Sequence, residues 1–453
     1  AVARPRDAPG VLTSAPMSSQ TPASTGPQHP TPPVAPPEAA GGATSAGRYA
    51  PLDILRTLAV VLVMFRHSAM APGTYPGWLQ SVLNTLLSCG WFGVDLFFVL
   101  SGFLISGLLF SEYRARGGVN IGRFLVRRGF KIYPAFYFFL LVSVLVERFV
   151  YGAPVNLTLQ PGSPRQLWPE LAFMQSYFWA YWNHTWSLAV EEHFYILLPI
   201  ILGLLAWLNR RFGEEPDRPV GFRPLPVVFL LVLLGAFLWR AEAIQRWPFE
   251  VDKRWFQIIR HMTPSHMRLD SLFVGVMLGY GYHFHRAMFL RWGAALSPVL
   301  LIGAAAGIAF GVRTPLDSAP MIRWGFPILA FSFAALIWSI LSLDQSHWGG
   351  RVKASVFGRV MARPAALCAY IGRHSYSIYL WHIVAADWGT RIAMNQLGLK
   401  PGTPDLYLVR LLCVTVGACA IGILAAKLVE NPVLRLRDRL FPSRSRAVIA
   451  PGS

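Results

Sequence analysis

The sequence predicts an all-α fold, a polytopic membrane bundle of about ten transmembrane helices preceded by a disordered N-terminal tail. Three observations support this prediction. The 453-residue chain is 54% hydrophobic and only 14% charged, well below the charged fraction of a typical soluble domain. Apolar stretches that approach the length of a bilayer crossing recur after residue 48. Lys and Arg gather beside these stretches, as they do at the cytoplasmic ends of membrane spans.

The first 48 residues differ from the rest of the chain. They are rich in Pro, Ala, Ser, Thr and Gly and contain few large apolar side chains, a composition typical of disordered segments. No short basic segment followed by an apolar core opens the sequence, so no cleaved signal peptide is expected. The first methionine is Met17, which leaves the natural start open. We therefore divide the chain into a tail (1–48), a membrane domain (49–440) and a short cytoplasmic tail (441–453).

Ten apolar spans are expected in the membrane domain, with cores near residues 54–71, 90–111, 130–149, 187–207, 225–241, 268–284, 293–312, 324–343, 368–388 and 405–429. Basic residues are concentrated after every second span and in the C-terminal tail. The positive-inside rule then places both termini in the cytoplasm. The connection from Arg240 to Arg268 is an exception, because its six Arg and Lys residues fall on the predicted outer side. We expect some of them to lie in a polar cavity.

The net charge of +19 does not indicate a nucleic-acid-binding protein, because the basic residues are distributed as membrane topology requires. The chain has four cysteines and no Cys-x-x-Cys pair, so neither a zinc site nor a disulfide framework is expected. The two closely spaced histidine pairs in the sequence lack acidic partners at ligand spacing. No metal site is predicted.

The first span carries an unusual pair of polar residues. Arg56 and His67 lie eleven residues apart, which places them on one face of a helix, about 16 Å apart along its axis. Asp53 stands three residues before Arg56 and can pair with it. In one interpretation Arg56 extends to the interface and His67 only ends the span. In the other, both line a protein interior or water-filled cavity, where a neutral imidazole could accept a proton from a hydroxyl.

Acidic residues occur in two further spans. Asp95 lies within a run of aromatic residues, where a carboxyl must be paired or protonated. Glu191 and Glu192 enter the fourth span, where either could orient or stabilise a catalytic imidazole. Ser101, in the same span as Asp95, lacks the Gly-x-Ser-x-Gly context of a hydrolase nucleophile. The role expected for it and the small residues around it is close helix packing.

A basic cluster precedes the third span. Its members are Arg127, Arg128 and Lys131. Such a cluster often serves only to fix membrane topology. It could also bind phosphate groups on the cytoplasmic side, because arginine presents a forked pair of donors to phosphate oxygens.

Together these stretches resemble the acyltransferase-3 family of integral-membrane O-acyltransferases. The resemblance runs from about Tyr49 to Leu440 and rests on the ordered segments LDILRTLAVVLVMFRH, GVDLFFVLSGFLISG, RRGFKIYP, WSLAVEEHFY, RLDSLFVGVMLG, SYSIYLWH and VENP. The Arg-x10-His pair of the family falls on Arg56 and His67. Its acidic residue in the Trp-Ser-Leu segment falls on Glu191, with Glu192 as the neighbouring candidate.

One family element is altered. The Arg-x3-Arg pattern falls on Arg127 and Lys131, so the charge is kept while bidentate phosphate recognition at the second position is lost. Arg128 is a further candidate for that task. Some relatives carry a hydrolase-like domain after the membrane part, and none is expected here, because the chain stops soon after the last span.

The resemblance implies an acyl-CoA donor, usually acetyl-CoA, and an acceptor hydroxyl on a sugar, envelope glycan, lipid or secondary metabolite. It also implies a bacterial inner-membrane location, with membrane lipids as the surroundings. The expected donor-binding residues are Arg56, Arg127, Arg128 and Lys131, and the expected catalytic residues are His67, Glu191, Glu192 and Asp95. His67 would act as general base, and an acyl-histidine intermediate is the alternative.

A different class of protein also fits part of the pattern. Buried Arg, His, Asp and Glu mark the pathways of secondary transporters and flippases, which could here move a glycan or lipid precursor. Transporters often carry internal repeats. The two halves of this sequence show no self-similarity, which favours the transferase.

Overall fold

The computed structural model describes residues 49–68, 76–152, 166–212, 222–249 and 260–443. The predicted tail 1–48 and most of the predicted C-terminal tail lie outside these residues. The described helices are α1 (Ala50–His67), α2 (Gly77–Cys89), α3 (Phe92–Arg116), α4 (Ile121–Phe149), α5 (Trp168–Leu171), η1 (Asn183–Thr185), α6 (Trp186–Phe212), α7 (Leu225–Arg246), η3 (Ser265–Met267), α9 (Leu269–Phe284), α10 (Arg286–Ala295), α11 (Ser297–Arg313), η4 (Met321–Gly325), α12 (Phe326–Asp344), α13 (His347–Ala354), α14 (Val356–Arg373), α15 (Ser375–Leu397), α16 (Pro404–Leu412), η5 (Cys413–Gly417), α17 (Ala418–Ala425), η6 (Ala426–Glu430) and α18 (Asn431–Leu440). The described part contains no β-sheet, which agrees with the predicted all-α class.

Local sequence explains where several helices begin and end. The Asn120 side chain accepts a hydrogen bond from the Arg123 amide at 2.9 Å and caps the start of α4. Helices α3 and α15 end at Gly117 and Gly398, whose φ angle is 68° in both cases. That left-handed conformation is readily accessible only to glycine. Proline stands in the first turn of α1, α7 and α11, where its missing N–H costs no hydrogen bond.

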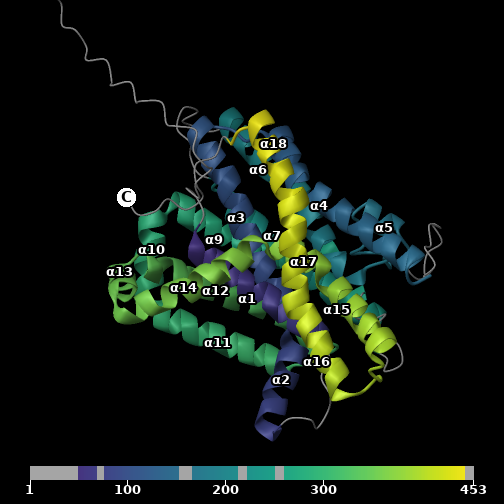
Figure 1. Cartoon of the computed structure of the whole chain (residues 1–453). Helices are drawn as coiled ribbons and strands as arrows, with labels where there is room; N and C mark the ends of the chain where they lie inside the picture. The colour runs from purple at the N-terminus through teal and green to yellow at the C-terminus, as the bar shows by residue number, and fades with distance from the viewer. Residues whose placement is uncertain (1–48, 69–75, 153–165, 213–221, 250–259, 444–453) are drawn as a thin grey trace, which may run out of the picture. The chain divides into compact units, whose positions relative to one another are not determined.

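Within the described residues, six helical segments are long and apolar enough to cross a bilayer: α3, α4, η1–α6, α7, η4–α12 and the continuous segment from α16 to α18. The pair α10–α11 is a seventh only if its two helices, which meet at a bend of 73°, are counted as one span. Each of these segments coincides with one of the predicted spans. The α16–α18 segment runs along the bundle as one long rod (Figure 1), and only 17% of its most apolar window is buried.

The other three predicted spans fall on α1, α9 and α15, which are helical but do not combine the length, apolarity and low charge of the segments above. Helix α9 has only 16 residues, and α1 includes Asp53, Arg56 and Arg66. The predicted core 368–388 is wrong as a single span, because the chain turns at His374 between α14 and α15. The count of ten transmembrane helices therefore stays a prediction.

Helix α3 forms the centre of the packing. It is largely buried and contacts α1, α6, α9 and α12. The α3–α9 contact depends on two glycines, since a Cβ atom at Gly102 would lie 1.9 Å from the Leu272 carbonyl oxygen and one at Gly275 would lie 2.1 Å from the Val99 carbonyl oxygen. Small residues allow such close approach of membrane helices, which agrees with the packing role expected at Gly102.

Helix α7 has the opposite character. Only 17% of its most apolar window is buried, and large apolar side chains on it are exposed, among them Leu230, Leu231, Leu234 and Leu238. An apolar surface of this kind is stable against lipid rather than water. The apolar helices thus indicate an integral membrane protein.

Candidate active site

A basic cavity of about 330 Å³ lies between α1, α3, α4, α14 and α18. Seven of its lining residues are basic and two are acidic: Arg56, Arg123, Arg127, Arg128, Lys131, Arg373 and Arg437, with Asp53 and Glu112. Three of the four predicted donor-binding residues come from one stretch of α4, and the fourth, Arg56, comes from α1. The structure thus brings all four together around one cavity.

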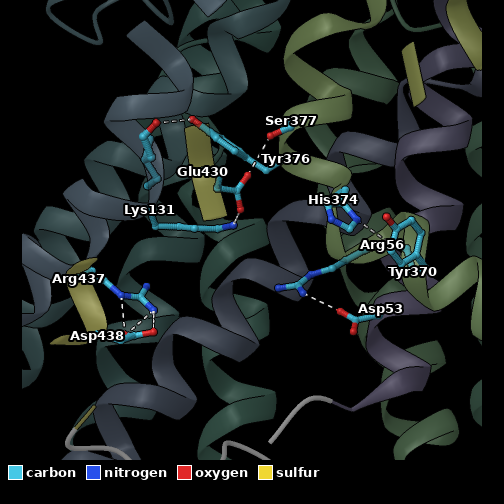
Figure 2. A network of polar contacts seen from close by, with 11 residues as sticks. Asp53, Arg56, Lys131, Tyr370, His374, Tyr376, Ser377, Glu430, Arg437 and Asp438 are labelled. Carbon is cyan, nitrogen blue, oxygen red and sulfur yellow. Dashed lines mark hydrogen bonds and ion pairs between the residues drawn. The ribbon is translucent and has the colours of Figure 1, made fainter. Parts of the chain in front are cut away.

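Acidic side chains pair with some of these cations (Figure 2). Arg56 donates to Asp53 at 2.9 Å, as their spacing predicted. Lys131 pairs with Glu430, whose second carboxylate oxygen accepts a hydrogen bond from Ser377 at 2.9 Å. The glutamate of the VENP segment therefore fixes the lysine that replaces the second arginine of the family pattern.

The end of α18 lies at the solvent-exposed rim of the cavity. Arg127 pairs with Asp438 at 3.1 Å and also donates to the carbonyl oxygen of Phe441. Arg437 pairs with the same Asp438 carboxylate at 2.8 Å (Figure 2). One carboxylate thus lies between two guanidinium groups, which leaves a net positive charge at the rim.

Arg128 and Arg373 have no acidic partner in the described part of the chain. The Arg128 guanidinium lies over the rings of Phe124 and Tyr195, 5.6 and 5.5 Å from their centroids. The Arg373 guanidinium lies 5.4 Å from the Tyr370 ring centroid. Aromatic faces hold a guanidinium in place while leaving its N–H groups free for an anion.

A second, narrower cavity of about 170 Å³ adjoins the first. Arg56, Arg128, Lys131 and Arg373 line both cavities. Away from these cations the wall is mainly apolar and aromatic, formed by Val94, Phe97, Phe98, Leu100, Leu104, Ile105, Ile132, Leu188, Tyr376 and Tyr379. A site that is basic at one end and mainly apolar at the other can hold a molecule that is anionic at one end and uncharged at the other.

Glu191 and Glu192 both line the narrower cavity. Tyr195 donates its hydroxyl proton to Glu191 and accepts a hydrogen bond from Ser101 at 2.9 Å, since each hydroxyl has one proton to give. Glu192 accepts from Tyr133 at 3.1 Å, and its other carboxylate oxygen has no partner among the described residues. Ser101, expected only to pack, is therefore part of the cavity wall.

His67 does not line either cavity. It ends α1, and its ring lies 5.1 Å from that of His382 on α15, between ring centroids. The His382 ring lies equally far, 5.1 Å, from that of His184. No contact between His67 and Glu191 occurs in the described part of the structure, so the expected support of His67 by Glu191 is not a direct contact here.

Asp95 also lies away from the cavity lining. Its carboxylate accepts a hydrogen bond from Arg268 at 2.5 Å, and both side chains are fully buried. A second buried pair, Arg240 with Asp270 at 2.7 Å, lies on the neighbouring helices α7 and α9. These contacts favour a packing role for Asp95 over the predicted catalytic one. Arg240 and Arg268 are the two ends of the basic connection that departs from the positive-inside pattern. Both therefore lie in buried ion pairs rather than in a polar cavity.

Sequence reasoning did not assign roles to several residues that line or adjoin the site: Arg373, Arg437, Tyr195, Ser187 and His184. Arg373 and Arg437 were hidden among basic residues that topology already explained. Tyr195 lies one turn after Glu191, so its four-residue spacing was a usable signal. His184 lies in the short helix η1, and only the folded chain brings it beside His382.

The described residues contain no group of three His, Cys, Asp or Glu side chains placed to hold a metal ion. The expectation that the site needs no metal stays a prediction.

The fold and the site define a cavity with a basic lining among apolar helices, and the comparisons with known proteins identify the class of protein. Residues 49–427 match the acyltransferase-3 family model, described as "Acyltransferase domain". The chain belongs to this family of membrane acyltransferases, as the motifs predicted.

Relatives among curated proteins point the same way. The chain is 26% identical over 349 residues to "O-acetyltransferase OatA" of Staphylococcus aureus strain NCTC 8325 / PS 47, covering 74% of this chain and 50% of that protein. The proteins of the same name in strains COL and MRSA252 match with the same figures. The chain thus spans about half the length of these relatives. No solved structure matches.

Proposed function

We propose that the protein is a membrane O-acyltransferase that moves an acyl group, acetyl in the first instance, from acyl-CoA to a hydroxyl on a sugar, envelope glycan, lipid or secondary metabolite. The observation that carries this proposal is the basic cavity beside a narrower, mainly apolar one, with four basic lining residues shared between them. The name of the curated relatives, O-acetyltransferase, supports acetyl as the group transferred.

The two ends of acyl-CoA match the two cavities in chemical character. Its phosphates would bind Arg128 and Arg373, which form no ion pair with a carboxylate among the described residues, with Arg56 and Lys131 at the boundary of the two cavities. Its uncharged arm and thioester would extend into the narrower cavity past Glu191 and Glu192. Because acyl-CoA is made in the cytoplasm, the basic cavity would face that side, and both termini would be cytoplasmic. The membrane would be the bacterial inner membrane.

In the proposed reaction His67 acts as general base. It takes the proton of the acceptor hydroxyl while the hydroxyl oxygen forms a bond to the thioester carbonyl carbon. The carbon–sulfur bond then breaks, the thiolate takes the proton back from His67, and the products are an ester and free CoA. An acyl-histidine intermediate is the alternative route to the same products. Glu191, Tyr195 and Ser101 would orient the acyl arm from the cavity wall.

The first test is transfer itself. Purified protein in lipid would be incubated with acetyl-CoA labelled on the acetyl group and with a panel of glycan and small-molecule hydroxyl acceptors. We expect label to appear as an ester on at least one acceptor, together with an equal amount of free CoA. Failure of acyl-CoA to bind at all, while Arg56 and His67 remain essential in cells, would instead favour the transporter alternative.

Donor affinity should depend on Arg128. We expect Arg128→Gln to raise the dissociation constant for acyl-CoA by about 10- to 100-fold, since a charge-assisted hydrogen bond contributes about 1.5–3 kcal/mol. The measurement is binding of a non-hydrolysable acyl-CoA analogue at several salt concentrations, where the variant should also show a weaker salt dependence.

Arg363→Gln is the matched control, because this exposed arginine on α14 lines neither cavity. If both variants bound the donor as tightly as the wild type, Arg128 would not contact the phosphates.

A further inference from the structure

Three histidines from separate parts of the chain form a small cluster beyond the narrower cavity. His67 ends α1, His184 lies in η1 and His382 lies in α15. The His382 ring is central, 5.1 Å from each of the other two ring centroids. His382 is fully buried and His184 nearly so, whereas His67 is partly exposed. Only His67 can therefore meet a molecule from outside without a rearrangement of the core.

Backbone carbonyls fix which nitrogen of each buried ring carries a proton. His382 Nδ1 lies 2.5 Å from the carbonyl oxygen of Tyr379, and His184 Nε2 lies 3.1 Å from that of Leu380. A carbonyl oxygen only accepts hydrogen bonds, so both of these nitrogens must be donors. In the neutral ring the other nitrogen is then an acceptor.

Those acceptor nitrogens lack partners. His382 Nε2 and His184 Nδ1 are both buried without a hydrogen bond among the described residues. A buried polar atom without a partner costs about 1–3 kcal/mol, and such atoms call for a functional explanation. The bare Nε2 of His382 belongs to the ring that packs against His67, so His67 can supply the missing donor.

The cluster adjoins the narrower cavity through one side chain, that of Tyr379. Tyr379 lines that cavity, and its ring centroid lies 5.3 Å from that of His382. Its hydroxyl donates to the carbonyl oxygen of His184 at 2.6 Å and accepts from Ser187 at 2.7 Å. The part of the cavity wall that Tyr379 forms is thus held in a fixed position relative to the histidines.

We infer that His382 is the positioning residue for His67: its bare Nε2 accepts the N–H of the His67 ring and directs the other ring nitrogen of His67 to the acceptor hydroxyl. This inference rests on the proposed transferase function. It replaces the expected role of Glu191, which bonds Tyr195 on the cavity wall instead. The two rings are close without a hydrogen bond in this structure, and such bonds often tighten only in the substrate complex.

When His67 takes the acceptor proton, its ring becomes positively charged and the N–H toward His382 becomes a stronger donor. The hydrogen bond would then be stronger in the transition state than in the free enzyme. Only such differential interactions raise kcat. Loss of the His382 acceptor should therefore lower kcat and leave the KM for acyl-CoA unchanged.

The test compares two substitutions at one position. We expect His382→Leu, which fills the site without an acceptor, to lower kcat by about 10- to 100-fold, less than the roughly 10²- to 10⁴-fold expected for loss of the base itself, because His382 acts only through His67. His382→Gln can place its amide oxygen near the position of Nε2. It should therefore recover at least a third of the decrease in log kcat that His382→Leu causes. Donor KM should change by less than about twofold in both variants.

His261→Leu is the matched control. This histidine is also fully buried, bonds a backbone carbonyl through one ring nitrogen at 2.9 Å and leaves the other without a partner among the described residues. It makes no ring contact with the cluster; its ring packs against Phe249. Its replacement should lower stability without lowering kcat.

A double-mutant cycle decides the matter even where His382→Leu folds poorly. His67→Gln and His382→Gln would be measured singly and together. If His382 acts through His67, the second substitution should have an effect of less than about twofold once His67 is gone, because residues that act as a unit are not additive. An undiminished His382 effect in the His67→Gln background would overturn the inference, as would a rise in donor KM at constant kcat.

Failure of the inference can be told from failure of the proposed function. If the wild-type protein transferred no acyl group to any acceptor, the function itself would be wrong. If it transferred acyl groups while His382→Leu and His382→Gln retained wild-type kcat, only the role of His382 would be wrong.

Discussion

Replacement of His67 by alanine is expected to lower acyl transfer by about 10²- to 10⁴-fold, the range in which loss of a general acid–base group usually falls. The acyl-CoA dissociation constant should change little, because His67 lines neither the basic nor the narrower cavity. The measurement is single-turnover transfer of labelled acetyl groups, with donor binding measured separately on the same preparation.

His193→Ala is a demanding control for this prediction. His193 belongs to the same Glu-Glu-His segment that the family resemblance singles out, yet it bonds Ser265 at 2.7 Å and lines neither cavity. It should retain most of the transfer activity. Equal losses in the two variants would argue against a special role for His67. Label retained on the wild-type protein, and absent from His67→Ala, would favour the acyl-histidine route.

Local spacing explains the parts of the site that could be predicted from the sequence. The Asp53–Arg56 pair follows from a three-residue interval on one helix, and the structure contains it at 2.9 Å. Arg127, Arg128 and Lys131 follow one another on α4, so their common cavity also follows from the helical repeat. In these cases the partners lie within two turns of each other, where helix geometry alone determines the contact.

Contacts between distant segments could not be predicted in the same way. Lys131 and Glu430 lie 299 residues apart, and no periodicity in the sequence links them. The histidine cluster likewise draws on three segments that meet only after the helices have packed. The turn at His374 was missed because the apolar residues on both sides of it read as one continuous span.

The Lys131–Glu430 pair bears on how the altered family pattern could still work. A lysine offers a single point charge, whereas an arginine would offer a forked pair of donors. Glu430 holds the Lys131 ammonium at the boundary of the two cavities, and Ser377 holds Glu430 in turn (Figure 2). Positional constraint from these neighbours can offset part of the geometric precision that the lysine lacks, while Arg128 and Arg373 would supply forked donors in the proposed donor site.

Loss of the arginine that pairs with Asp95 is expected to give the largest change in stability. Arg268→Met should lower the free energy of unfolding by about 3–5 kcal/mol, because it leaves a buried carboxylate without its partner. Both side chains are fully buried, and the Arg268 guanidinium also lies 3.8 Å from the centroid of the Phe326 ring. Thermal or denaturant unfolding of the purified protein in detergent would measure the loss. Arg246→Met is the control, because the Arg246–Glu242 pair is exposed and should contribute at most about 1 kcal/mol.

The double variant Asp95→Leu/Arg268→Met separates a packing role for Asp95 from a catalytic one. Replacement of both charges by apolar side chains removes the need to bury either, so stability should return to near or above that of the wild type. If Asp95 only packs, transfer activity should return with it. A double variant that is stable and binds acyl-CoA yet transfers nothing would restore Asp95 to the catalytic group that its place in the sequence first suggested. Because Asp95 touches Arg268 and lines neither cavity, we expect activity to follow stability.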